Sequence, residues 1–324
     1  MNKILTISIV FFLSVTAGCG RKNIIKLPEK KGELLTVDFQ KGKTLKYRFV
    51  SDRHTTVDWS SGQNGESVLN KSIEKLDLVM AYKPVKIEPF GLTTIKAECR
   101  EAKVSSSNSS PKDAVEFFNG KTFTFTVDSS GKIHDYSELN DLIKQAGQKA
   151  FASGTGANRI KEPDMIGDFA ATQWFLWDSI ASIPNAAQGV NVGQSWTSKL
   201  SVPTPMVSRL ARDVNYTLAE VQSSDNTNIA VIDSTYSKSD SVPASWPVPY
   251  TGSFQVRGTF GLLGGYKLLE LKGQGKEIFN IDLGRIEEYN QKYKLVVQAS
   301  VPMGISVKPV INIEQTISMK LVEE

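Results

Sequence analysis

The chain has 324 residues, of which 40% are hydrophobic, 22% charged and 9% aromatic. This composition is typical of a globular protein and excludes a disordered, collagen-like or polytopic membrane protein. The 38 Lys and Arg residues nearly balance the 34 Asp and Glu residues, so no strong field favours nucleic acid as a partner. With two histidines and two cysteines, we expect no metal site, no cofactor and no thiol chemistry.

Residues 1–18 predict a secretory signal peptide. Lys3 precedes an apolar run, and small residues follow before Cys19. The roughly twelve apolar positions cover about 18 Å as a helix, short of the ~30 Å hydrocarbon core of a bilayer. The sequence Val15–Cys19 resembles the bacterial lipobox, although Thr16 replaces the usual leucine. This resemblance implies cleavage before Cys19 and acylation of its side chain; a plain cleaved signal with an incidental cysteine is the alternative.

Residues 19–32 predict a lipidated basic tether, with five basic side chains and one acidic side chain. Two or more acyl chains hold a protein on a membrane where one chain does not. The basic residues add attraction for anionic lipid, or serve only as a solvated linker. Gly20 rather than aspartate follows Cys19, and the sorting rule of Gram-negative lipoproteins then implies the outer membrane, facing the periplasm.

From residue 33 onward, apolar residues alternate with a period of two more often than 3.6, which predicts antiparallel strands with one solvated face. Cys99 is expected to be a buried thiol on one of these strands. His54 and His134 are expected to have surface polar roles. The clearest predicted strands span residues 45–50, 73–80, 92–97, 123–127, 216–221, 229–233, 292–297 and 311–319.

Two segments break this alternation and predict helices. Residues 135–151 carry apolar side chains at helical spacing, and Asp135 with Glu138 can cap the start. Residues 163–183 are apolar on nearly every side, begin with Pro163 and stop before a proline. We expect this second helix to be packed inside the fold, with an interfacial membrane helix as the alternative. The predicted fold class is therefore mainly β: a curved antiparallel sheet or open half-barrel with two packed helices.

Four aromatic residues are the candidate ligand contacts. Trp174 and Trp177 lie on the second predicted helix, and Trp246 and Tyr250 lie in a proline-rich loop. Together they could line a hydrophobic cleft. For the helix pair, packing in the core is the alternative. For the loop pair, packing and a position at the lip of a binding site are equally favoured.

The two halves of the chain share a weak correspondence that indicates an internal duplication. A strand, a bend with Asp and Gly, and a restarting strand occur at residues 120–133 and again at 275–286. We therefore divide the folded part into a first β-rich lobe, 33–187, with both helices, and a second, 188–324. Chance similarity between amphipathic hairpins is the alternative.

Three features accompany the lipobox: the hairpin ending at Ile133, the stretch Pro184–Trp196 and the hairpin with Gly284. With the lipobox, they resemble an uncharacterised family of β-rich bacterial envelope lipoproteins, a domain of unknown function. The resemblance spans most of residues 33–320 and implies neither an activity nor catalytic residues. More loosely, long strands with buried helices resemble the half-barrel of periplasmic lipoprotein carriers, in which a curved sheet and a helical plug enclose an acyl-chain cavity.

No nucleophile elbow, P-loop, dinucleotide fingerprint, zinc-protease motif or paired Cys-x-x-Cys occurs in the chain. The sequence therefore predicts a non-enzymatic envelope lipoprotein, held on the membrane through acylated Cys19, that binds a lipid or other apolar ligand in the concavity near residues 163–183. The alternative is a structural or protein-interaction lipoprotein whose partner is another envelope protein. An enzyme is motivated only by spare carboxylates.

Overall fold

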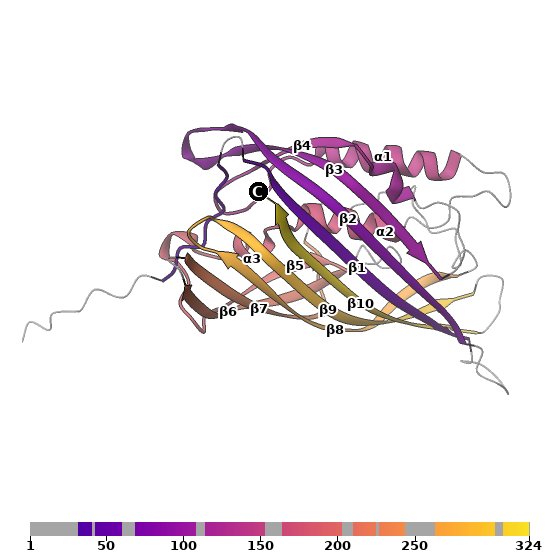
Figure 1. Cartoon of the computed structure of the whole chain (residues 1–324). Coiled ribbons are helices and arrows are strands. Elements are labelled where there is room, and N and C mark those ends of the chain that lie inside the picture. The colour runs from indigo at the N-terminus through magenta and orange to yellow at the C-terminus, as the bar shows by residue number, and fades with distance from the viewer. Residues whose placement is uncertain are drawn as a thin grey trace, which may run out of the picture. The chain divides into compact units, whose positions relative to one another are not determined.

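The computed structural model describes residues 32–40, 43–59, 69–107, 114–152, 164–202, 210–224, 227–243, 263–301 and 307–323. Ten antiparallel strands form one sheet in the order β4-β3-β2-β1-β10-β9-β8-β7-β6-β5 (Figure 1). The sheet curves but stays open, with β4 and β5 as its edges, and this confirms the predicted fold class. The strands are β1 Leu45–Asp58, β2 Leu69–Ile87, β3 Thr93–Ser106, β4 Thr122–Val127, β5 Ser195–Ser201, β6 Ala211–Ser224, β7 Thr227–Lys238, β8 Gly264–Asn280, β9 Arg285–Ser300 and β10 Val310–Glu323.

The order of the strands explains where the helices lie. The first and last strands pair in the middle of the sheet, from Lys46 opposite Glu323 to Asp58 opposite Val310. Strands β4 and β5 follow each other in the chain but form opposite edges. The connection between them must therefore cross the sheet. It carries helices α1 Ser137–Ala152, α2 Asp164–Trp174 and α3 Asp178–Ala181. In Figure 1, α1 lies along β4, and α2 and α3 lie within the curve of the sheet.

The alternation in the sequence located most strands correctly. Each of the eight predicted segments overlaps an observed strand. The prediction did not include β5 or the first half of β8. Strand β8 carries glycines where a side chain would collide with its neighbours: a Cβ at Gly273 would lie 2.6 Å from the Tyr293 Cβ, and one at Gly275 would lie 2.6 Å from the Ser234 Oγ. Glycine inside a strand marks this kind of close approach.

Helix α1 confirms the predicted helix at 135–151, but the predicted helix at 163–183 is interrupted. Helix α2 ends at Trp174, a turn covers Phe175–Trp177, and α3 follows. In an uninterrupted helix, Asp178 would follow Trp174 by one turn and share its face. The turn instead directs the Asp178 carboxylate toward the hydroxyl groups of Tyr216 and Ser198, which donate hydrogen bonds of 2.8 and 3.0 Å.

The two predicted lobes contribute to one continuous sheet, and the boundary at residue 187 falls in the connection between the edge strands. Both predicted bends are present: Gly131 has a φ of 83° and Gly284 a φ of 58°, a region that favours glycine. The duplication itself stays a prediction. Among the described residues, no helix is both long and apolar enough to cross a membrane.

Candidate functional site

The predicted ligand residues at the end of α2 and in the turn that follows it lie in the core. Trp174 and Trp177 are almost fully buried. The Trp177 ring packs edge-on against Phe39, with ring centroids 5.4 Å apart, and also contacts Tyr82 and Phe125. Burial of this kind fits the packing role that the sequence left open, and contact with a ligand stays a prediction. Three other predicted residues, Cys19, Trp246 and Tyr250, lie outside the described residues.

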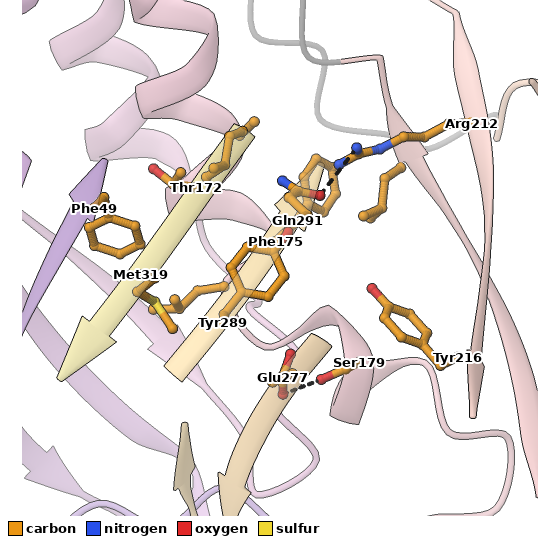
Figure 2. Close-up of a pocket in the computed structure, with 14 residues that line it drawn as sticks. Phe49, Thr172, Phe175, Ser179, Arg212, Tyr216, Glu277, Tyr289, Gln291 and Met319 are labelled. Carbon is orange, nitrogen blue, oxygen red and sulfur yellow. Dashed lines mark hydrogen bonds between the residues drawn. The ribbon is translucent and has the colours of Figure 1, made fainter. Parts of the chain in front are cut away.

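A small cavity of about 50 Å³ lies between the helical connection and the concave face of the sheet (Figure 2). A water molecule needs roughly 10–15 Å³, whereas drug-sized ligands occupy pockets of about 300–1,000 Å³. In the structure the cavity therefore has room for a few waters. Its lining residues are Phe49, Ala171, Thr172, Phe175, Leu176, Ser179, Leu200, Arg212, Tyr216, Glu277, Tyr289, Gln291, Ile317 and Met319.

The cavity has an apolar wall and a polar wall. In Figure 2, Phe49 and Met319 lie on one side, while Arg212 and Gln291 lie on the other. The Arg212 guanidinium lies 4.7 Å from the ring centroid of Tyr236, and its Nη1 donates a long hydrogen bond of 3.4 Å to Gln291. Among the described residues, no carboxylate forms an ion pair with Arg212, and its Nε has no hydrogen-bond partner. The polar wall thus presents a buried cation that contacts aromatic rings and a neutral amide directly, and interacts with the Asp178 carboxylate only at longer range.

Two carboxylates, the buried one of Glu277 and the partly buried one of Asp178, lie where α3 meets the sheet. The Ser179 hydroxyl donates a 2.6 Å hydrogen bond to Glu277 Oε1. Burial, with a smaller contribution from the nearby Asp178 carboxylate, raises the pKa of Glu277 to about 7 against the opposing effect of the Ser179 hydrogen bond. Burial also raises the pKa of Asp178 to about 6, against the opposing effect of hydrogen bonds from Tyr216 and Ser198. Near neutral pH, the polar wall therefore contains groups close to their titration point.

A separate polar cluster attaches α2 to the sheet. Asp168 of α2 accepts a 2.7 Å bond from Arg53 Nη2 on β1. The Ser51 hydroxyl and the Gln315 amide donate to the same carboxylate at 2.8 and 2.7 Å. A second carboxylate, that of Glu74, lies 3.7 Å from Arg53 Nη1. We call these five residues the Arg53 cluster. All of them are buried, so the cluster positions α2 by charge as well as by packing.

These polar residues were not predicted from the sequence, although a signal for them exists. On β1, all odd-numbered residues from Leu45 to Val57 face inward, and Arg53 is one of them. Arg212 shares the inward face of β6 with Val214 and Tyr216. Glu277 shares the inward face of β8 with Phe279. A charged residue at an inward position of an alternating strand indicates a buried polar site.

The remaining candidate reactive side chains of the described residues are Cys99, His54 and His134. Cys99 lies buried on β3 as predicted, and burial raises the pKa of its thiol to about 12. The exposed His134 contacts Asp128, with Nε2 2.7 Å from Oδ2, rather than its neighbour Asp135. His54 is also exposed. Among the described residues, no group of three or more His, Cys, Asp and Glu side chains could hold a metal ion.

Comparison with known proteins gives little further information. No protein-family model and no curated protein matches the sequence. A solved structure of lipovitellin, described in terms of its lipid–protein interactions, is similar with a TM-score of 0.36 and 11% sequence identity. The match covers 88% of this chain and 25% of that chain, so this chain spans about a quarter of lipovitellin's length. A similarity of this size gives no information about the function of this chain.

Proposed function

We propose that this protein is a non-enzymatic lipoprotein of the bacterial envelope, anchored through acylated Cys19, that binds an amphipathic ligand such as a lipid between its helices and the concave face of its sheet. The proposed location is the outer membrane, facing the periplasm. The lipobox-like sequence supports the anchor. The buried cation of Arg212 beside an apolar wall supports the ligand.

Arg212 is the observation that carries the ligand proposal. A buried charge is costly unless it is paired, and the ring of Tyr236 offsets only part of this cost. An anionic headgroup beside Arg212 would form the direct ion pair that the described residues do not provide, and the apolar wall formed by residues such as Phe49 and Met319 would contact the tail. Since the cavity measures about 50 Å³, a tail can enter only if the segment around Phe175 and α3 moves away from the sheet.

Native mass spectrometry of the chain from Gly20 onward tests this proposal, with oleate as an anionic single-chain probe. This form contains every described helix and strand. The unmodified chain should retain one oleate, and the Arg212→Gln variant should retain about tenfold less, as expected for loss of a charge-assisted hydrogen bond of about 1.5–3 kcal/mol. The matched control is Arg48→Gln on β1, since Arg48 is exposed and pairs with Asp77.

Equal retention of oleate by the Arg212→Gln and Arg48→Gln variants would show that Arg212 does not bind the ligand. A clean mass without ligand, both as purified and after incubation with oleate, would instead favour the alternative function, a structural or protein-interaction lipoprotein whose partner is an envelope protein. Thermal unfolding of each variant shows whether a loss of retention reflects a loss of fold.

Cys19→Ser tests the anchor independently of the ligand. Serine cannot form the thioether that carries the diacylglycerol, so the variant should lack the lipid mass and move from the membrane fraction to the soluble fraction. Two acyl chains are required for stable attachment, so the change in distribution should be nearly complete. Fractionation followed by mass measurement of the N-terminal peptide checks this. A wild-type N-terminal peptide without lipid would contradict the anchor.

A further inference from the structure

The hairpin between β2 and β3 presents an exposed aromatic side chain in an unfavourable backbone conformation. Its tip is the short helical turn Pro89–Gly91. Phe90 has φ 74° and ψ 12°, and among the described residues it is the one non-glycine residue with a positive φ. Its side chain is fully exposed, with a relative exposure of 102%. Neither the backbone nor the packing of this fold explains a phenylalanine at this position.

The physical cost of Phe90 indicates a role outside the fold. A left-handed backbone favours glycine, because any Cβ crowds the following carbonyl. An exposed ring gains nothing from the hydrophobic effect until something covers it. Strained and solvent-exposed residues of this kind occur where a surface makes contact with a partner.

Two more apolar side chains accompany Phe90. Val85 and Ile87, at the end of β2, have 43% and 40% of their surface exposed. Lysines lie among them: Lys83 and Lys86 on β2 are exposed, and Lys86 forms an ion pair with Glu88. An apolar tip flanked by lysines suits a bilayer surface, where the tip enters the acyl region and the lysines meet anionic headgroups.

The hairpin also lies at the end of the sheet where the described chain begins. The backbone N–H of Val37 donates to the Ser129 carbonyl at 2.8 Å. Ser129 is also next to the hairpin, since a Cβ added at Gly91 would lie 3.3 Å from the Ser129 Cβ. From Val37 the segment leads away from the hairpin to Gly32, which lies beside Gly189 and Val190, and the Glu33 N–H donates to the Val190 carbonyl at 2.9 Å. The thirteen residues from Cys19 to Lys31 span at most about 45 Å when fully extended.

We propose that the tip of the β2–β3 hairpin, with Phe90 as its leading residue and Val85 and Ile87 behind it, inserts into the lipid surface that carries the protein. The proposal builds on the anchoring of Cys19, because that anchor holds Gly32, at the same end of the sheet as the hairpin, within about 45 Å of the bilayer. The membrane thus receives two contacts, the acyl chains and the hairpin. A pocket on a partner protein or a second copy of the chain would be a different occupant, and the test distinguishes them.

An environment-sensitive dye at position 90 provides the first test. The chain from Gly20 onward contains one cysteine, Cys99, which is buried with the pKa of its thiol raised to about 12 and should not react. A dye such as NBD therefore labels a Phe90→Cys variant selectively. The matched control is Leu69→Cys, at the opposite end of β2 and 50% exposed. Both chains carry an N-terminal histidine tag and are held on phosphatidylcholine and phosphatidylglycerol vesicles that contain nickel-chelating lipid.

The dye at position 90 should shift to the blue and be quenched by a nitroxide on the lipid acyl chain, while the dye at position 69 should not change. An unchanged dye at position 90 on tethered protein overturns the proposal. A blue shift without vesicles that grows with protein concentration also overturns it, because it indicates a second copy. The nickel tether replaces the acyl chains, so failure of Cys19 acylation cannot produce either result.

A second variant separates membrane contact from folding. Phe90→Gly suits the positive φ, so its unfolding midpoint should equal or exceed that of the unmodified chain. The untagged Phe90→Gly chain should partition onto the same vesicles, prepared without nickel lipid, about tenfold or more weakly than the untagged unmodified chain. This is the loss expected when binding no longer transfers a phenylalanine side chain out of water. Unchanged partition would show that Phe90 does not contact the membrane.

Discussion

Replacing Asp168 by alanine should lower the free energy of unfolding by about 3–5 kcal/mol, because it leaves a buried guanidinium without its closest anion. The Asp168 carboxylate has no exposed surface, and Arg53 Nη2 lies 2.7 Å from it. The Ser51 hydroxyl and the Gln315 amide would also lose their shared acceptor. Glu74, at 3.7 Å from Arg53, replaces only part of this interaction.

Asp213→Ala is the matched control for this prediction. Asp213 also pairs with a cation, Lys199, but both side chains are more than a third exposed. Solvent screening limits such a pair to about 1 kcal/mol or less. Urea unfolding of both variants, with the slope m checked for constancy, measures the difference. Equal losses in the two variants would mean that the Arg53 cluster does not position α2.

The contacts of the helices with the sheet indicate which part moves when a ligand enters. Helix α2 has two buried polar attachments, the bond from Asp168 to Arg53 and the 2.6 Å hydrogen bond from the Tyr82 hydroxyl to Gln173. The contacts of α3 with the sheet are hydrogen bonds, those from Tyr216 and Ser198 to Asp178 and that from Ser179 to Glu277, and the two carboxyl groups have pKa values of about 6 and about 7. Because an ion pair is harder to separate than a hydrogen bond to a neutral acid, we expect α3 to leave the sheet more readily than α2.

The fold could be predicted from the sequence because alternation survives in most strands. On β10, for example, Ile311, Ile313, Ile317 and Met319 all face inward, and the same parity runs through β1. The order of the strands could not be predicted, because the pairing of β1 with β10 joins residues at the two ends of the described chain. The break after Trp174 was also hidden, since the partners that favour it, Tyr216 and Ser198, lie on the second half of the sheet.

The candidate site was harder to predict than the fold. The sequence predicted a site from its aromatic residues. The polar wall of the cavity instead depends on Arg212 and Glu277, which are far apart in the chain. The alternation along each strand indicates that both side chains point inward. Whether they line the same cavity depends on the positions of β6 and β8 in the sheet. Phe90 followed no periodic pattern, because its interest comes from backbone conformation and exposure.

Glu277→Gln should stabilise the protein at pH 8 by about 3 kcal/mol and have little effect near pH 4.5. The pKa of Glu277 is raised from 4.5 to about 7 by burial. Between these values the folded chain keeps a proton that the unfolded chain releases, so stability falls as the pH rises through this window and is constant above it. A difference of about 2.5 pKa units corresponds to about 3 kcal/mol. Glutamine removes the titration and can still accept the hydrogen bond from Ser179.

The loss of stability between pH 5 and pH 7 in the unmodified chain should also include a part from Asp178, whose pKa is raised by burial in the same direction, to about 6. Glu277→Gln should therefore reduce the slope of stability against pH without abolishing it, and Asp178→Asn should remove a further part. Glu270→Gln is the control on the same strand, because Glu270 is exposed and pairs with Lys272. Urea unfolding at intervals from pH 4.5 to 8 measures the slopes. A slope that Glu277→Gln leaves unchanged would mean that Glu277 is already ionised in the folded chain, and the polar wall of the cavity would then carry a full negative charge beside Arg212.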